Sequence, residues 1–131
     1  MNRSQSTNDA YPSSIHLGLV LGNLEVIAAY KELIAAFAAK ATEFANILKM
    51  GRTQLQDAVP MTLGQEFKAF ARSFGDEVSA LERVQNVLYE VNMGGTAIGT
   101  GLNAPRGYAQ KSRRPPRGNL RLPDQVGRGL D

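Results

Sequence analysis

Two stretches of the sequence carry apolar residues at alternating steps of three and four. The earlier series consists of Ile27, Tyr30, Ile34, Phe37, Ala41, Phe44 and Leu48. Such spacing is typical of one face of a helix and excludes a strand. Polar residues that can cap a helix stand at Ser6–Asp9, and Pro12 fits a first helical turn. We therefore predict a helix over about Asp9–Lys49.

The later series has the same steps. It consists of Leu63, Phe67, Phe70, Phe74, Val78, Leu81, Val84, Leu88 and Val91. Thr62 lies directly before this series and Gln65 lies three residues later. This is the spacing of a capping box, in which each side chain accepts a hydrogen bond from the backbone N–H of the other residue. The pattern predicts a second helix that ends near Asn92, with its phenylalanines packed in a core.

The sequence thus predicts an all-α chain built on a hairpin of two long helices. At a rise of 1.5 Å per residue these helices would be roughly 60 and 45 Å long. A single pair of that length cannot cover both apolar series and the apolar residues beside them. Because helices in proteins are stabilised mainly by packing, we expect oligomerisation in an extended helical bundle, or further helices outside this sequence.

The segment Gly51–Gln65 between the two predicted helices is polar at its start and closed by Pro60. It carries more hydrogen-bonding side chains than a turn requires: Arg52, Thr53, Gln54, Gln56 and Asp57. Loops held by rigid elements are favoured places for binding residues. The alternative is an ordinary polar connection, because polarity alone is a weak signal.

A glycine-rich segment, Met93–Leu102, follows the second predicted helix. It has neither the lysine of a phosphate-binding loop nor a preceding strand for a dinucleotide fingerprint. We predict a helix terminator and close-packing loop that is lined by Thr96 and Thr100.

Composition narrows the chemistry. The 131 residues include no cysteine and one histidine, which excludes a disulfide framework and argues against a zinc site. We expect no metal, no cofactor and no role for His16. No apolar run is long enough to span a membrane, and the first residues do not resemble a signal peptide. The expectation is a cytoplasmic protein without a membrane partner.

Charge divides the chain near residue 110. Residues 1–110 hold nine Lys/Arg and ten Asp/Glu, whereas residues 111–131 hold six and two. We therefore expect a helical domain over 1–110, followed by a basic tail rich in Pro, Gly and Arg that is disordered by composition. Because the basic residues do not share a folded face, a nucleic-acid partner is not expected.

Three segments, in order, resemble the aspartase/fumarase superfamily, and within it the aspartate ammonia-lyases. They read S-T-N-D at Ser6–Asp9, G-R-T-Q-L-Q-D-A-V-P-M-T-L-G-Q at Gly51–Gln65, and G-G-T-A-I-G-T-G-L-N at Gly94–Asn103. The resemblance covers about residues 1–110. It implies a homotetramer with a central bundle of long helices, active sites assembled from several subunits, and reversible elimination of ammonia from L-aspartate to give fumarate.

The resemblance also implies site residues. Ser6 and Thr7 would hold the side-chain carboxylate of the substrate, and Asn8 would face its amino group. The start of a long helix suits an anion, because its backbone N–H groups and dipole are positive there. Thr53, from a different subunit, would contact the other carboxylate. The alternative for the residues before the helix is simple N-capping.

Gln54 stands where fumarases and some aspartases of the family carry histidine. Glutamine cannot transfer a proton, and an amine leaves more readily than a hydroxyl, so this residue favours an aspartase. Two alternatives remain. One is a fragment of a lyase resembling fumarate hydratase, and the other is a non-catalytic helical oligomerisation module whose basic tail binds nucleic acid.

The sequence also departs from the family pattern. The family loop of type G-S-S-x-M-P-x-K-x-N, which carries the catalytic serine, does not occur, so no catalytic residue is assigned. A further family threonine, from a preceding region, has no counterpart. We interpret the chain as a truncated fragment whose tail arises from a shifted reading frame or a premature ending, and we expect it to be inactive alone.

Overall fold

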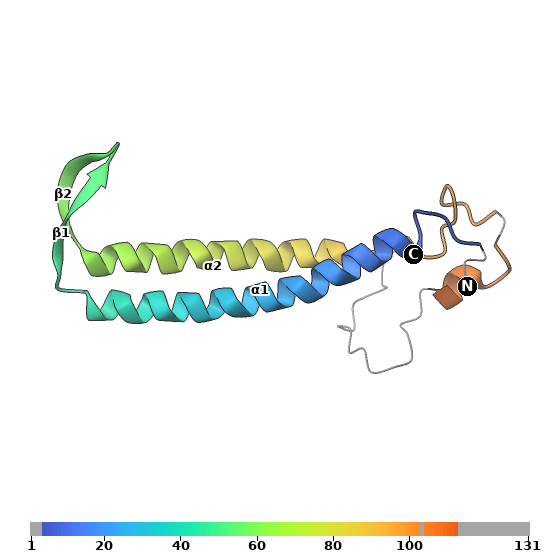
Figure 1. Ribbon diagram of the computed structural model, residues 1–131, viewed down its shortest axis with the longest axis horizontal. Coiled ribbons are helices and arrows are strands. Elements are labelled where there is room, and N and C mark those ends of the chain that lie inside the picture. The colour runs from blue at the N-terminus through green and yellow to red at the C-terminus, as the bar shows by residue number, and fades with distance from the viewer. Residues whose placement is uncertain (1–3, 103, 113–131) are drawn as a thin grey trace. The chain divides into compact units, whose positions relative to one another are not determined.

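The computed structural model describes residues 4–102 and 104–112 of the chain. Their elements are, in order, α1 (Ala10–Glu43), β1 (Leu48–Thr53), β2 (Gln56–Thr62), α2 (Leu63–Leu88) and α3 (Tyr108–Ser112), as labelled in Figure 1. The chain forms two compact units, Met1–Asn23 with Arg83–Asp131, and Leu24–Glu82. The two long helices confirm the prediction of a mainly helical fold, but the small sheet makes the all-α description too strict.

The first helix ends six residues before the predicted boundary of Lys49. After Glu43 the chain turns, with the amide of Ala45 donating to the carbonyl of Thr42 and that of Ile47 to Phe44. Leu48, the last member of the earlier apolar series, therefore lies in β1 and is 79% exposed. Spacing alone could not detect this end, because the three- and four-residue steps continue through the turn.

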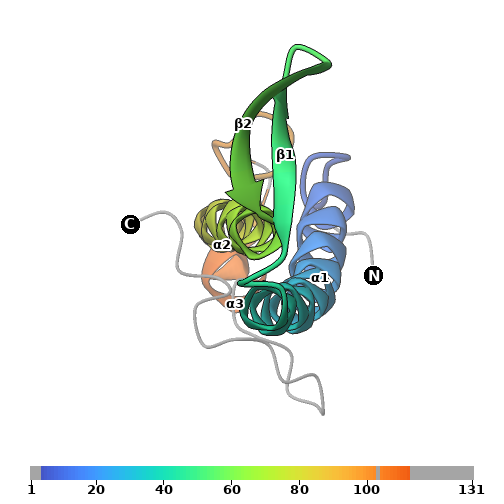
Figure 2. The ribbon, with the colours of Figure 1, turned by 90° about the vertical axis from the view of Figure 1, so that its left-hand side faces the viewer.

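The predicted polar loop is instead an antiparallel β-hairpin (Figure 2). Thr53 pairs with Gln56, and Met50 pairs with Pro60. Proline is tolerated because a two-stranded sheet has only edge strands, where a backbone N–H can be missing. The pairing is irregular between Met50 and Arg52. Gly51 lies at this irregularity, where an added Cβ would meet the Val59 carbonyl oxygen at 2.9 Å.

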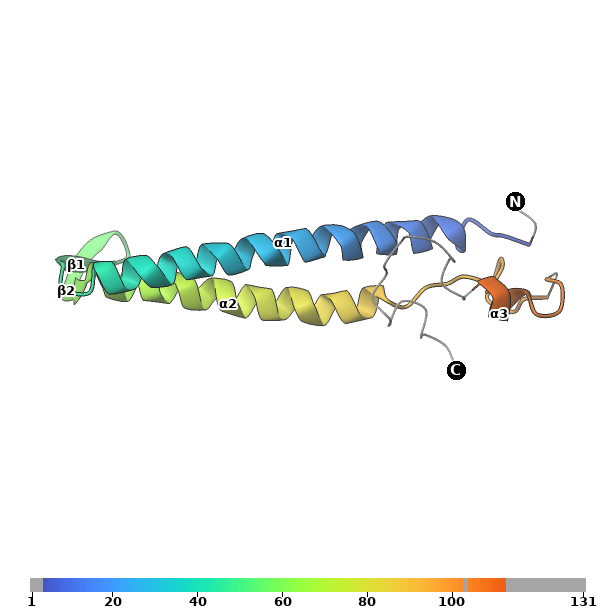
Figure 3. The same cartoon turned by 90° about the horizontal axis from the view of Figure 1, so that it is seen from below.

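Within the unit Leu24–Glu82, the later part of α1 and the first part of α2 run side by side (Figure 3). Aromatic rings form a continuous series between them, with centroids 5.2–6.0 Å apart: Tyr30, Phe37, Phe44, Phe67, Phe70 and Phe74. Such separations are typical of favourable aromatic pairs. The phenylalanines thus pack against one another, but none of them is buried as the predicted core requires, and Phe70 keeps 44% of its surface exposed.

The start of α2 confirms the predicted capping box. The Thr62 amide donates to Gln65 Oε1 at 2.9 Å, and the Gln65 amide donates to Thr62 Oγ1 at 3.1 Å. Lys49 Nζ in β1 lies 2.6 Å from Glu66 Oε1 in the first turn of α2. These contacts fix the hairpin to the helix that follows it.

In the other unit, polar contacts join the first part of α1 to the last part of α2. Asn23 Nδ2 donates to Gln85 Oε1 at 3.1 Å, and Gln85 Nε2 donates to the hydroxyl of Tyr89 at 2.8 Å. His16 Nδ1 lies 2.8 Å from the carbonyl oxygen of Glu90. His16, to which the sequence assigned no role, thus contacts the backbone just after α2, which ends at Leu88 and not near Asn92.

The described residues leave much apolar surface uncovered. Val20, Ile27 and Val78 are the buried hydrophobic side chains, whereas Leu19 and Val84 are each more than 50% exposed. No helix in this part of the chain is long and apolar enough to cross a membrane.

The helix α3 extends to Ser112, past the domain boundary expected at residue 110. The rest of the predicted tail, 113–131, lies outside the described residues.

Candidate functional site

The motif Ser6–Asn8 forms a tight turn immediately before α1. Ser6 Oγ accepts the amide of Asn8 at 3.2 Å, and the carbonyl of Ser6 accepts the amide of Asp9 at 3.1 Å. Thr7 and Asn8 are exposed and Ser6 is half-buried. The turn is therefore open to a ligand, as the predicted substrate-binding role requires.

Asp9 begins the helix and is itself fully buried, with 0% of its surface exposed. Its carbonyl accepts the amide of Ser13 at 3.3 Å, so it is the N-cap residue of α1. Its carboxylate accepts hydrogen bonds from residues outside the helix. Oδ2 accepts the amide of Ser6 at 2.7 Å, and Oδ1 accepts the amides of Gly94 and Thr96 at 3.1 and 3.3 Å.

These bonds join the turn to the glycine-rich segment, which the sequence predicted as a close-packing loop. Gly94 is buried with a φ of 90°, and a Cβ there would come within 2.7 Å of Ala109 Cα. Thr96 also has a positive φ, 64°, which is uncommon for a β-branched residue. The loop closes on itself through the Gly101 amide, which donates to the carbonyl of Gly95. Close packing is thus observed.

A cavity of about 280 Å³ lies between the turn and this loop. It is lined by Asn8, Asn92, Gly95, Thr96, Ala97, Ile98 and Gly99. Small-molecule sites are concave and combine a few polar groups with apolar walls. Two carboxamides and a threonine facing one small cavity offer both donors and acceptors, which suits a small polar ligand.

A second cavity, of about 340 Å³, borders the same loop residues. Ser4, Gln5, Thr96, Ala97, Ile98, Thr100 and Leu102 line it. Thr96 and Thr100, the two threonines predicted to line the loop, thus both border this cavity. Ser6 and Thr7 line neither of these two cavities. Asn8, the third predicted residue of this turn, lines the first of them.

Thr53 and Gln54 lie in the other unit, at the tip of the β-hairpin. Thr53 closes the ladder opposite Gln56, and Gln54 and Leu55 form the two-residue turn. Both turn residues have positive φ, 50° and 62°. Two consecutive residues with positive φ are typical of the tight turns that suit hairpins, and glycine or asparagine usually supplies them. Thr53 and Gln54 are exposed, so the tip is accessible.

Two of the polar hairpin residues serve the hairpin itself. Arg52 Nε lies 3.1 Å from Asp57 Oδ1, and these two residues face each other in the ladder. Their side chains are 73% and 67% exposed, and exposed ion pairs contribute about 0–1 kcal/mol. The abundance of polar residues here is thus partly structural, as the alternative interpretation of this segment held.

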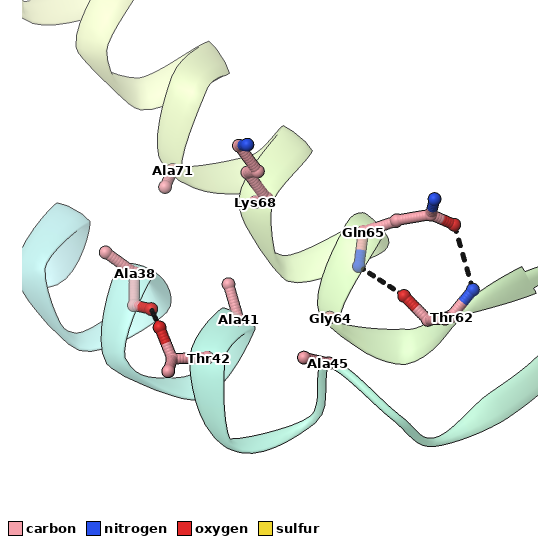
Figure 4. Close-up of a pocket in the computed structure, with 9 residues that line it drawn as sticks. All are labelled: Ala38, Ala41, Thr42, Ala45, Thr62, Gly64, Gln65, Lys68 and Ala71. Carbon is pink, nitrogen blue, oxygen red and sulfur yellow. Dashed lines mark hydrogen bonds between the residues drawn. The ribbon is translucent and has the colours of Figure 1, made fainter.

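A hollow of about 570 Å³ in the same unit lies where α1 ends and α2 begins (Figure 4). Ala38, Ala41 and Ala45 from the α1 side face Gly64, Lys68 and Ala71 of α2, and the lining is completed by Thr42, Thr62 and Gln65. The polar groups of Thr62 and Gln65 are engaged in the capping box. This hollow reflects small side chains at a close helix contact, and it holds no predicted site residue.

Comparison with known proteins identifies the family. The family model described as "Lyase" matches residues 1–115. The chain belongs to this lyase family. Over 109 residues, or 82% of this chain, it is 62% identical to the aspartate ammonia-lyase of Pseudomonas aeruginosa. Over 83% of the chain it is 52% identical to the aspartate ammonia-lyase of Escherichia coli strain K12. The predicted resemblance is confirmed.

Solved structures agree with this assignment. A fumarate lyase:delta crystallin from Brucella melitensis matches 86% of this lyase chain with a TM-score of 0.78 and 54% identity. A class II fumarase from Schistosoma mansoni matches the same share with a TM-score of 0.77 and 34% identity. This chain spans about a quarter of either protein, 24%, and 23% of the two curated relatives.

Sequence reasoning missed two features of this candidate site. It treated Asp9 only as a possible helix cap, and it did not single out Asn92. The signal for Asp9 was its place in a motif directly before a long helix. For Asn92 the signal was weaker, a lone polar residue between Val91 and the glycine-rich segment. The structure describes no group of three or more His, Cys, Asp or Glu residues that could hold a metal ion, within residues 4–102 and 104–112.

Proposed function

We propose that this chain supplies substrate-binding residues to an ammonia-lyase that reversibly converts L-aspartate to fumarate and ammonia. The observation that carries the proposal is that Asn8 and the glycine-rich loop share the lining of a small cavity. The reaction is suggested by relatives named aspartate ammonia-lyase, which are 52–62% identical to this chain. Because the chain spans under a quarter of their length, the reaction belongs to the larger assembly.

The proposed roles follow from position and chemistry. Ser6 and Thr7 precede a helix of 34 residues, whose first backbone N–H groups and dipole favour an anion. Their hydroxyls would bind the side-chain carboxylate of L-aspartate and stabilise the charge that gathers on it when the neighbouring carbon loses its proton. The carboxamide oxygen of Asn8 would accept a hydrogen bond from the substrate ammonium group.

The hairpin would complete the site from a neighbouring subunit of a homotetramer. Thr53 would donate its hydroxyl to the second carboxylate of the substrate. Its exposure at a hairpin tip supports this role, because the group is accessible to another chain. Gln54 beside it would not transfer a proton, which suits an amine leaving group better than a hydroxyl.

A second candidate is the hydration of fumarate. The similarity to a class II fumarase at 34% identity and a TM-score of 0.77 favours it, because the fold of this chain is compatible with either reaction. The higher identity to the aspartate ammonia-lyases, together with Gln54, leads us to prefer ammonia elimination.

A chimeric enzyme tests the proposal. The 109 matched residues of the Pseudomonas aeruginosa relative would be replaced by those of this chain, and fumarate formation from L-aspartate would be followed by ultraviolet absorbance. We expect turnover of L-aspartate and none of L-malate. A folded tetrameric chimera that converts L-malate but not L-aspartate would instead support the fumarase assignment.

Variants of the chimera test the individual roles. Asn8→Ala should lower kcat/KM for L-aspartate about tenfold or more, because a hydrogen bond to a charged group is worth about 1.5–3 kcal/mol. Asn46→Ala is the matched control, since Asn46 is an exposed carboxamide in the turn after α1, and it should leave kcat/KM unchanged. Equal activity of both variants would contradict the role of Asn8.

The separate 131-residue chain should not produce fumarate, because the family serine loop does not occur in it. Purified chain incubated with L-aspartate tests this expectation. Formation of fumarate in proportion to the amount of chain would show that its own residues include a proton-abstracting group.

A further inference from the structure

We propose that Asp9 is a positioning residue that holds the Ser6–Asn8 turn against the glycine-rich loop and so sets the shape of the cavity between them. This inference rests on the proposed function, in which Asn8 binds the substrate. It assigns to Asp9 a role beyond capping α1. Asp9 itself does not line the cavity, so it acts through the residues that it holds.

The carboxylate of Asp9 connects the two walls directly. Its Oδ2 accepts the amide of Ser6 at 2.7 Å, two residues before Asn8 on one wall. Its Oδ1 accepts the amides of Gly94 and Thr96 at 3.1 and 3.3 Å. Thr96 lines the opposite wall. Gly94 and Thr96 are 85 and 87 positions from Asp9 in the sequence. This carboxylate therefore holds together two segments that are far apart along the chain.

Burial makes the arrangement specific. Asp9 is 0% exposed, and a buried charge is tolerated only when hydrogen bonds or opposite charge satisfy it. Here three backbone amides do so, assisted by the positive end of α1. Hydrogen bonds to an ionised group are roughly twice as strong as neutral ones. Movement of either wall would leave part of the charge unsatisfied, so the two walls are held at one separation.

The loop needs such a contact to keep its shape. Thr96 has a φ of 64°, and a β-branched residue persists in this unfavourable region only where its surroundings hold it there. The amide of Thr96 is one of those that donate to Asp9. We infer that loss of this acceptor would let Thr96 relax and change the wall on which it lies.

Two substitutions separate this role from helix capping. Asp9→Asn keeps the size of the side chain but has only one oxygen acceptor. Its NH₂ group must therefore face either the amide of Ser6 or the amides of Gly94 and Thr96. Asp9→Ser keeps a preferred N-cap residue but is too short to reach Gly94 and Thr96. Asp76→Asn is the matched control, because Asp76 is an exposed carboxylate on α2.

The first measurement needs no ligand. Amide hydrogen exchange would be followed by nuclear magnetic resonance in the full 131-residue chain. In Asp9→Ser we expect exchange of the Gly94 and Thr96 amides to accelerate about tenfold or more. In Asp9→Asn we expect the same acceleration for the amides that face its NH₂ group, which are that of Ser6 on one side or those of Gly94 and Thr96 on the other. Helix content by circular dichroism and exchange within α2 should be unchanged in both variants. Unchanged exchange at Ser6, Gly94 and Thr96 in both variants would overturn the inference, and if one variant unfolds, the same three amides in the other variant decide.

The second measurement adds succinate, an unreactive dicarboxylate. Succinate should shift the Asn8 and Asn92 side-chain amide signals of the unaltered chain and of Asp76→Asn with equal dissociation constants. In both Asp9 variants the dissociation constant should rise about tenfold. A simple capping role predicts that Asp9→Ser binds as the unaltered chain does, and that result would refute positioning.

The two ideas can fail separately. If succinate binds the unaltered chain and both Asp9 variants equally, the proposed function survives and the positioning role of Asp9 is lost. If succinate shifts no signal in any of the proteins, the proposed substrate site is contradicted, and exchange at Gly94 and Thr96 alone decides whether Asp9 holds the loop.

Discussion

Gly64, the second residue of α2, should tolerate no side chain. An added Cβ would lie 2.5 Å from the carbonyl oxygen of Ala41 and 2.8 and 2.9 Å from Cα and N of Ala45. All three atoms belong to the backbone, so no rotamer change can make room. The contact is tight because the amide of Gly64 donates to the carbonyl of Phe44 at 3.0 Å, drawing the start of α2 onto the end of α1. Gly64→Ala must therefore separate these segments.

We expect Gly64→Ala to lower the free energy of unfolding by about 1–3 kcal/mol, the usual cost of overpacking. Gly75→Ala is the matched control on the same helix, since nothing lies within 4 Å of its added Cβ. It should raise the free energy of unfolding by about 0.5–1 kcal/mol, because alanine is the better helix former. Opposite signs are thus expected for one chemical change.

Urea denaturation of the full chain, followed by circular dichroism, measures both changes. The midpoint should fall for Gly64→Ala and rise for Gly75→Ala at a similar slope, since similar surface is exposed on unfolding. If Gly64→Ala were as stable as the unaltered chain, the close approach of α1 and α2 would not exist in solution.

Three other substitutions should also change stability in the same assay. Thr62→Ala removes the hydroxyl that accepts the Gln65 amide and should cost about 1 kcal/mol; no loss would exclude the capping box. Phe37→Ala removes a ring that contacts three others and should lower the free energy of unfolding by about 3 kcal/mol. A decrease smaller than that caused by an alanine substitution at an exposed position would contradict this packing. Leu55→Gly replaces a residue with a φ of 62° and 101% exposure, and should stabilise the hairpin by roughly 0.5 kcal/mol; faster amide exchange in β1 would contradict this.

The helices could be predicted because their signals are local. The three- and four-residue steps located both, and the spacing of Thr62 and Gln65 predicted the capping box that the structure contains. The ends were less well predicted. The apolar steps run on to Leu48 and Val91, whereas α1 ends at Glu43 and α2 at Leu88, because spacing does not report where the backbone turns.

The hairpin was missed for physical reasons. Its turn uses Gln54 and Leu55 at positive φ, where Asn-Gly or a similar pair would have been a recognisable signal. Pro60 within β2 reads as the end of a loop, because proline cannot donate to a ladder. Pairing of Arg52 with Asp57 also cannot be deduced from polarity, which equally suggests a binding loop.

The candidate site was predicted only as separate motifs. Resemblance marked Ser6, Thr7 and Asn8, and the structure finds them accessible before α1. What a single sequence could not predict is the contact from Asp9 to Gly94 and Thr96. Neither periodicity nor composition pairs residues that are 85 positions apart.

The two parts of the proposed site differ in how they are held, and this difference has a consequence for binding. The Ser6–Asn8 turn is fixed before any ligand arrives, by a buried carboxylate with three backbone donors. Thr53 instead lies on an exposed two-stranded hairpin whose turn residues are in unfavourable conformations and whose ion pair is exposed. An isolated hairpin is marginal in water, so this part is the one that packing against another subunit would order. The cost of ordering a segment is subtracted from binding. It follows that recognition of one substrate carboxylate should survive in the separate chain, whereas recognition of the second should require assembly.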